Sequence, residues 1–239
     1  MNFLKKLWKH RRELRSIHKS IYFNFHYLPL SQAIHLPILF YKPKFLNLKG
    51  KVVIKGRVKF GLIKMGFPMV SIYPNSGIMF ENHGGTLLFK GKCEIGNNSA
   101  ISIGSKGYVE IGDLFISTTS LKLVCYHEVV IGERCLFGWD CLIMDTDLHK
   151  LAKRFGGFSK GYSNIKIGSD NWFGNGCVLM KRTQTPDYCV ISARTILSSK
   201  IDVPSYSVIG QKREVEILAT DLWRNIDDDA IDYADDKEV

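Results

Sequence analysis

Apolar residues recur every six positions through the second half of the chain. Stepping by six, the residues are Ile167, Phe173, Leu179, Thr185, Ile191, Leu197, Val203 and Ile209. Seven of these eight are apolar, and six of the seven residues found four places after the first seven are small or polar. An α-helix repeats its apolar stripe every 3.6 residues, so a strict spacing of six does not fit a helix.

The same spacing continues upstream. Ile131, Phe137 and Ile143 follow one another in steps of six, and Ile143 lies 24 residues, or four repeats, before Ile167. Weaker copies of the pattern begin at Ile95. Glycine follows the apolar residue at positions 96, 112, 132, 138, 168, 174 and 210.

A six-residue repeat fits a triangular prism in which each hexapeptide forms one face. The apolar residue then points inward, the small residue fills the narrow interior, and glycine relieves crowding at the corner. Successive turns stack as parallel strands roughly 4.8 Å apart. Because a single turn cannot bury its own interior, a stable prism needs several. The spacing therefore predicts an all-β fold, a parallel β-helix.

The rest of the chain divides around this repeat. Residues 1–45 are expected to form a basic helical segment, in which apolar residues such as Trp8 lie on one side and cations on the other. Residues 46–213 are expected to form the β-helix, with a glycine-rich loop at 150–164 extruded from it. Residues 214–239 are expected to form a short helix and an acidic tail.

Charge is unevenly distributed along the chain. The formal net charge is +10; residues 1–20 hold seven cations and one acid, and residues 227–239 hold seven acids and one lysine. A basic surplus indicates an anionic partner. No nucleic-acid-binding motif occurs, so we expect no nucleic acid. Two interpretations of residues 1–20 stay open: weak contact with an anionic membrane surface, or packing on the β-helix or a neighbouring subunit.

The cysteines and the absence of export signals bear on location and metal binding. Residues 1–20 lack the apolar core of a secretory signal, and no apolar run of about 18 residues occurs. We therefore expect a cytoplasmic protein, or one peripheral at the inner face of the membrane, with six reduced cysteines that serve as small buried residues. No Cys-x-x-Cys pair or His/Cys cluster occurs, so no metal is expected.

Three motifs lie within the repeat. They are Ile-Gly-Glu-Arg-Cys-Leu-Phe-Gly at 131–138, Asp-Thr-Asp-Leu-His at 145–149 and Asn-Trp-Phe-Gly at 171–174. In these motifs, over about residues 90–230, the chain resembles hexapeptide-repeat acyltransferases, and most of all those that O-acetylate capsule, O-antigen and other surface polysaccharides. The resemblance implies a left-handed β-helix, acetyl-CoA as acyl donor, and a sugar or polysaccharide hydroxyl as acceptor. It also implies a homotrimer with active sites between subunits, where loop 150–164 reaches the neighbouring copy.

The resemblance assigns roles to individual residues. His149 matches the general base, a neutral imidazole that takes the proton of the acceptor hydroxyl as its oxygen attacks the thioester. Asp147 and Asp145 alternate with His149 along an extended segment, and either can orient the imidazole. Trp172 matches a tryptophan that in some members donates a hydrogen bond to the thioester oxyanion. The other interpretation of Trp172 is a side chain that covers a corner of the coil.

The same resemblance places acetyl-CoA along the last coils. By the repeat register, the residues at the matching positions are Asn175, Ala193, Ser198 and Ser199. This chain departs from the family at two donor-binding motifs: Gly-Ala-Gly-Ser becomes Ser-Ala-Arg-Thr at 192–195, and Gly-Asn-Pro-Ala-Lys becomes Gly-Gln-Lys-Arg-Glu at 210–214. An acceptor-binding asparagine of the galactoside-type enzymes is also absent, because the corresponding region reads Ser117–Ser120.

Two alternative functions stay open. The fold also hosts γ-type carbonic anhydrases, so one alternative is a non-catalytic or metal-using β-helix. A zinc site of that type needs three convergent histidines, whereas His127 lies 22 residues from His149 and no other histidine is closer. The second alternative is an acetyltransferase whose acceptor is a small molecule other than a sugar.

Overall fold

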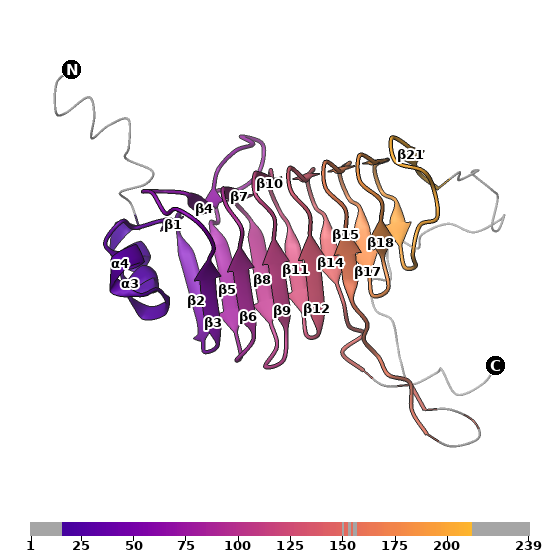
Figure 1. Cartoon of the computed structure of the whole chain (residues 1–239), viewed down its shortest axis with the longest axis horizontal. Coiled ribbons are helices and arrows are strands. Elements are labelled where there is room, and N and C mark those ends of the chain that lie inside the picture. Colours follow the sequence, from indigo (N-terminus) through magenta and orange to yellow (C-terminus); the bar gives the residue numbers. More distant parts are fainter. Residues whose placement is uncertain (1–15, 150, 153, 155–156, 212–239) are drawn as a thin grey trace, which may run out of the picture.

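The strands form a triangular prism of three parallel sheets (Figure 1). This computed structural model describes residues 16–149, 151–152, 154 and 157–211. From β1 to β20 the chain visits the three sheets in strict rotation, so each strand pairs in parallel with the strand three places earlier. This arrangement confirms the predicted left-handed parallel β-helix.

The three faces of the prism are named here sheets A, B and C. Sheet A has eight strands: β1 (Ile38–Phe40), β4 (Ile63–Phe67), β7 (Cys93–Gly96), β10 (Phe115–Ser117), β13 (Leu136–Phe137), β16 (Trp172–Phe173), β19 (Val190–Ile191) and β21 (Val208–Ile209). Sheet B has seven: β2 (Pro43–Leu48), β5 (Ile78–Asn82), β8 (Ser99–Ile103), β11 (Lys122–Cys125), β14 (Leu142–Met144), β17 (Val178–Met180) and β20 (Ile196–Leu197). Sheet C has six: β3 (Lys51–Ile54), β6 (Thr86–Phe89), β9 (Tyr108–Ile111), β12 (Glu128–Ile131), β15 (Ile165–Ile167) and β18 (Gln184–Thr185).

The interior holds the residues that the six-residue spacing places inward. Phe137 and Phe173 are fully buried and stack with ring centroids 4.3 Å apart, and Phe115 lies 5.6 Å from Phe137. All six cysteines are buried and free, as predicted. Small thiol side chains suit a prism this narrow because each inward residue meets its counterparts in the coils above and below.

A helix closes the first coil of the prism. In α3 (Ile17–Tyr27), Asn24 Oδ1 accepts a hydrogen bond from the backbone N–H of Ile38 at 3.1 Å, and Ser20 Oγ accepts from that of Phe40 at 2.9 Å. Ser16, one turn earlier, likewise accepts from the N–H of Lys42 at 2.9 Å. These side chains, spaced by four, replace the missing neighbouring strand of β1 and so protect an open sheet edge. A short helix, α4 (Leu30–Ala33), follows.

The boundaries differ from the expectation at the N-terminal end. The prism begins at Ile38, inside the 1–45 segment that was expected to precede it. Prolines at 37 and 43 flank β1, and the first corners are irregular, so the six-residue spacing is not visible there. Residues 1–15 and the expected C-terminal helix and acidic tail at 214–239 lie outside the described residues. Within the described residues no helix is long and apolar enough to cross a membrane.

Candidate functional site

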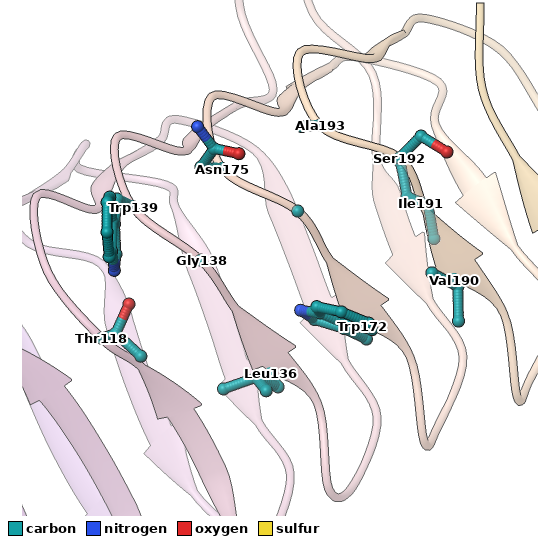
Figure 2. A pocket seen from close by; sticks show the side chains of 11 residues that line it. Thr118, Leu136, Gly138, Trp139, Trp172, Asn175, Val190, Ile191, Ser192 and Ala193 are labelled. Carbon is teal, nitrogen blue, oxygen red and sulfur yellow. The ribbon is translucent and has the colours of Figure 1, made fainter.

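A groove of about 600 Å³ runs along the outer surface of sheet A toward its corner with sheet B (Figure 2). Its floor consists of Leu136, Trp172 and Val190, which are in register on β13, β16 and β19. Their side chains point out of the prism because each precedes an inward residue such as Phe173. Trp172 is 53% exposed. The floor is therefore apolar and open to solvent.

Glycines form the wall of the groove at the corner. A Cβ atom on Gly138 would lie 2.9 Å from the backbone N of Asn175, and one on Gly174 would lie 2.7 Å from that of Ala193. Glycine is thus required for successive coils to approach backbone to backbone. In the part of the chain that the structure describes, the N–H groups of Trp139, Asn175 and Ala193 have no hydrogen-bond acceptor. These amides are left as donors for a ligand.

An aromatic contact defines the end of the groove that lies toward the earlier coils. The ring of Tyr73, from the segment between β4 and β5, lies 5.8 Å from that of Trp139 in an edge-on arrangement. Its hydroxyl donates a hydrogen bond to Asp140, and this bond raises the pKa of Tyr73 above its usual value. The segment between β4 and β5 therefore reaches forward to the rim, a contact between residues 66 positions apart.

The structure brings together three of the predicted site residues. Trp172, Asn175 and Ala193 all line this groove. Ser198 and Ser199 do not; they line a separate hollow of about 510 Å³ beside Arg182. Sequence reasoning missed several residues of the groove, although outward positions directly before a buried repeat residue would have identified its floor. The missed residues are Thr118, Leu136, Gly138, Trp139, Gly174, Val190, Ile191 and Ser192.

An arm leaves the prism between β14 and β15 (Figure 1). His149 lies on this arm, which starts at the corner between sheets B and C, whereas the groove lies on sheet A toward its corner with sheet B. The side chain of His149 is exposed, and its ring has no hydrogen-bond partner among the described residues. Asp147, two residues earlier, forms an ion pair with Lys181, and its backbone N–H donates to the carbonyl of Gly161 at 2.7 Å. Asp147 therefore fixes the root of the arm, and within one chain its carboxylate binds lysine rather than imidazole.

Asp145 has a different role from the one expected. It is fully buried, and its two oxygens accept hydrogen bonds from the backbone N–H groups of Tyr126 and His127 at 2.8 and 2.7 Å. The chain turns directly after Asp145, so the extended alternation that would place it beside His149 ends there. Asp145 holds the preceding coil, and the prediction that it can orient the imidazole is wrong.

The arm exposes apolar side chains. Isolated antiparallel bridges join Thr146 to Tyr162 and Ala152 to Phe158, so its described parts run as a narrow hairpin. Leu148, Leu151 and Phe158 are 55%, 69% and 65% exposed. Exposure of this degree on a projecting element is typical of a surface that a partner covers.

Metal-binding side chains do not gather in the described residues. No group of three or more His, Cys, Asp or Glu is placed to hold a metal ion there. His127, the second histidine near the arm, packs against Tyr162 with ring centroids 5.0 Å apart. A zinc site built around His149 would have to draw its other ligands from elsewhere.

Comparisons with known proteins add one finding. No family model and no curated protein matches the chain. Among solved structures, the chain is similar to the one titled "Crystal Structure of the polySia specific acetyltransferase NeuO", with 19% identity, a TM-score of 0.43, and coverage of 82% of this chain and 77% of that chain. A likeness of this degree leaves function to be inferred from the groove, the arm and the motifs of the chain itself.

Proposed function

We propose that this protein is an acetyl-CoA-dependent O-acetyltransferase that acts on a hydroxyl of a sugar or surface-polysaccharide precursor. The observation that carries the proposal is that Trp172, matched by motif to acyl transfer, and Asn175 and Ala193, matched by the repeat register to donor binding, line one groove. An apolar floor beside a row of unpaired backbone N–H groups suits the pantetheine arm of CoA, an extended chain that carries two amides.

Trp172 supports the transfer step by its position. Its indole is half exposed in the groove, and its Nε1–H has no acceptor in the described part of the chain. A fixed donor of this kind stabilises the negative charge that develops on the thioester oxygen. The unpaired N–H groups at the corner are further donors for the same oxygen or for the pantetheine amides.

The general base comes from a neighbouring copy in this proposal. His149 and the groove occupy different sides of the same prism, so one chain alone does not bring them together. In a homotrimer of parallel prisms, the arm of one copy reaches the groove of the next. The apolar residues Leu151 and Phe158 on the arm then cover Leu136 and Val190, and both surfaces leave water.

The chemistry needs one base and no covalent enzyme intermediate. The imidazole of His149 takes the proton of the acceptor hydroxyl while the hydroxyl oxygen bonds to the acetyl carbonyl carbon. The C–S bond then breaks, and the proton passes to the departing thiolate, which gives the acetyl ester and free CoA. Asp147 orients His149 by fixing the root of the arm through Lys181 and Gly161.

The test is transfer of labelled acetyl from acetyl-CoA to a panel of sugars. His149→Ala is expected to lower kcat/KM by about 10²–10⁴-fold, the usual contribution of a general base, and to keep its melting temperature because the side chain is exposed. His127→Ala is the matched control and is expected to stay within a few-fold of wild type. Normal transfer by His149→Ala together with loss in a folded His127→Ala would move the base one coil earlier and contradict the assignment.

A further inference from the structure

The N-terminal end of the prism carries no carboxylate. We define the base as residues 16–60, which comprise α3, α4 and the first coil. The base has no Asp or Glu, although the chain has 23 of them. Its eight cations account for +8 of the net charge of +10. They are Lys19, Lys42, Lys44, Lys49, Lys51, Lys55, Arg57 and Lys59.

The outer face of the two helices is apolar and exposed. Ser20, Phe23 and Asn24 of α3 are buried against the first coil, so the opposite side of the helix faces away from the prism (Figure 1). Single exposed apolar residues are normal on a protein surface, but here five large ones gather on two adjacent helices and on the residue that follows the second. They are Ile21, Tyr22, Phe25, Leu30 and Ile34, each at least 41% exposed.

Cations lie at all three corners of the first coil: Lys42 between β1 and β2, Lys49 between β2 and β3, and three more between β3 and β4. At the corner between sheets C and A, Lys55, Arg57 and Lys59 line a hollow of about 1010 Å³, together with His35 and the half-exposed Phe60. None of these three cations is ion-paired with a carboxylate within the described residues. The two other lysines of the hollow are already paired: Lys90 with Glu110, and Lys92 with Glu94 at 2.6 Å.

One acid lines the same hollow. Asp113 accepts hydrogen bonds through Oδ1 from the backbone N–H groups of Lys92 and Leu114, at 2.5 and 2.9 Å. It therefore serves the local turn rather than the three cations. The hollow is left with a surplus of positive charge and with room for an anionic group.

We propose that the base is a docking surface for a membrane that contains anionic lipids. The apolar helix face enters the headgroup–acyl boundary, and the surrounding cations bind the lipid phosphates. An acidic polysaccharide or a nucleic acid would use the charge but would leave the apolar face uncovered. Residues 1–15, which precede α3 in the sequence, add six Lys and Arg against one Glu and extend the same charge.

A deletion that tests the N-terminal segment has to end before Ser16. Ser16 and Ser20 cap the edge of β1, so deletion of residues 1–20 would damage the fold. Deletion of residues 1–15 leaves this cap in place and separates the contribution of the preceding segment from that of the base.

The experiment is vesicle co-sedimentation of the full-length chain, with phosphatidylcholine vesicles and with vesicles that also contain phosphatidylglycerol. Wild type should bind the anionic vesicles at low salt and less at high salt, because salt screens the lipid charge. Lys55→Gln/Arg57→Gln/Lys59→Gln should weaken binding about tenfold or more. Phe25→Ser/Leu30→Ser should weaken it as well. Melting temperature verifies that each variant is folded.

Matched controls lie on later coils. Lys106→Gln/Lys122→Gln/Lys166→Gln removes three exposed cations there, and Ile196→Ser/Val208→Ser removes two exposed apolar residues; both should bind like wild type. Equal weakening by base and control variants would overturn the proposal. The proposal would also be overturned if deletion of residues 1–15 abolished vesicle binding while the variants in residues 16–60 had no effect. A third contradicting result would be that residues 16–60 bind a soluble polyanion but the protein does not bind vesicles. Acyl transfer does not enter this readout, so the two proposals fail independently.

Discussion

The contact between α3 and β1 allows the most quantitative prediction. Asn24 is fully buried, its Oδ1 accepts from the backbone N–H of Ile38 at 3.1 Å, and its Nδ2 donates to the carbonyl of Ile38 at 2.7 Å. Asn24→Ala leaves both backbone groups of Ile38 without these partners at the sheet edge. Each buried polar group left unsatisfied costs about 1–3 kcal/mol, and water entering the vacated space recovers part of this. We expect a loss of about 2–4 kcal/mol.

The measurement is equilibrium unfolding in urea followed by circular dichroism, with the midpoint and the slope determined separately. His18→Ala, on the exposed side of the same helix, is the control and should change stability by less than about 0.5 kcal/mol. A loss below about 0.5 kcal/mol for Asn24→Ala would refute the view that α3 replaces the missing strand beside β1.

Two further changes test the interior and the corners of the prism. Phe173→Ala removes a fully buried ring stacked 4.3 Å from Phe137 and should lower the free energy of unfolding by about 3–5 kcal/mol. Trp172→Ala, one residue earlier but 53% exposed, should lower it by less than about 1 kcal/mol. Equal losses would contradict the assignment of Phe173 to the interior and Trp172 to the outer surface. Arg134 donates hydrogen bonds to both oxygens of Asp170, at 2.6 and 2.8 Å, and lowers the pKa of that carboxyl. The pair therefore stabilises the fold at pH values above the ordinary aspartate pKa of about 4. This stabilisation is lost as the pH falls through the lower pKa of Asp170 in the folded protein. Asp170→Asn should therefore show a smaller fall in melting temperature between pH 5 and about pH 2 than wild type does, and an unchanged fall would show that the pair contributes nothing.

The six-residue spacing predicted the later coils because it keeps its phase there: the arm between β14 and β15 adds 18 residues, a multiple of six. Within the first coil, β1 and the start of β2 lay outside the predicted β-helix at 46–213, because prolines flank β1 and the six-residue spacing is not visible there. The cap on β1 also could not be foreseen, since Ser16, Ser20 and Asn24 are ordinary polar residues until the edge that they serve is known.

The groove was partly predictable because 18 residues, three hexapeptides, return the chain to the same corner. Ala193 lies 18 residues after Asn175. Trp139 lies one coil before Asn175, at a distance of 36 residues, because the arm is inserted between β14 and β15. Ser198 follows Ala193 by five residues, so the chain has already turned past sheet B. The repeat register therefore placed Asn175 and Ala193 correctly at one corner, but Ser198 and Ser199 lie beyond β20 and do not share it.

The motif singles out His149 as the candidate base, and in the proposed homotrimer its relation to the groove depends on how the copies associate. The sequence places it at the root of an extruded loop, and the structure leaves its ring exposed and without a partner in the described residues. Under this proposal, the groove that His149 reaches is set by how the prisms associate, which no spacing within one chain encodes.

The most direct test of the central proposal, a site shared between copies, combines two defective variants. His149→Ala removes the proposed general base and keeps the groove, and Trp172→Ala alters the groove and keeps the general base. The two variants are co-expressed in equal amounts, so that they mix in trimers with heterologous contacts. Half of the subunits then keep His149 and the other half keep an intact groove, so about one quarter of the sites join an intact His149 to an intact groove. Acetyl transfer by the mixture should then recover to about a quarter of the wild-type rate, well above either variant alone. If the activity of the mixture is no higher than the mean of the two separate variants, the general base and the groove of a site belong to one chain, which would contradict the account.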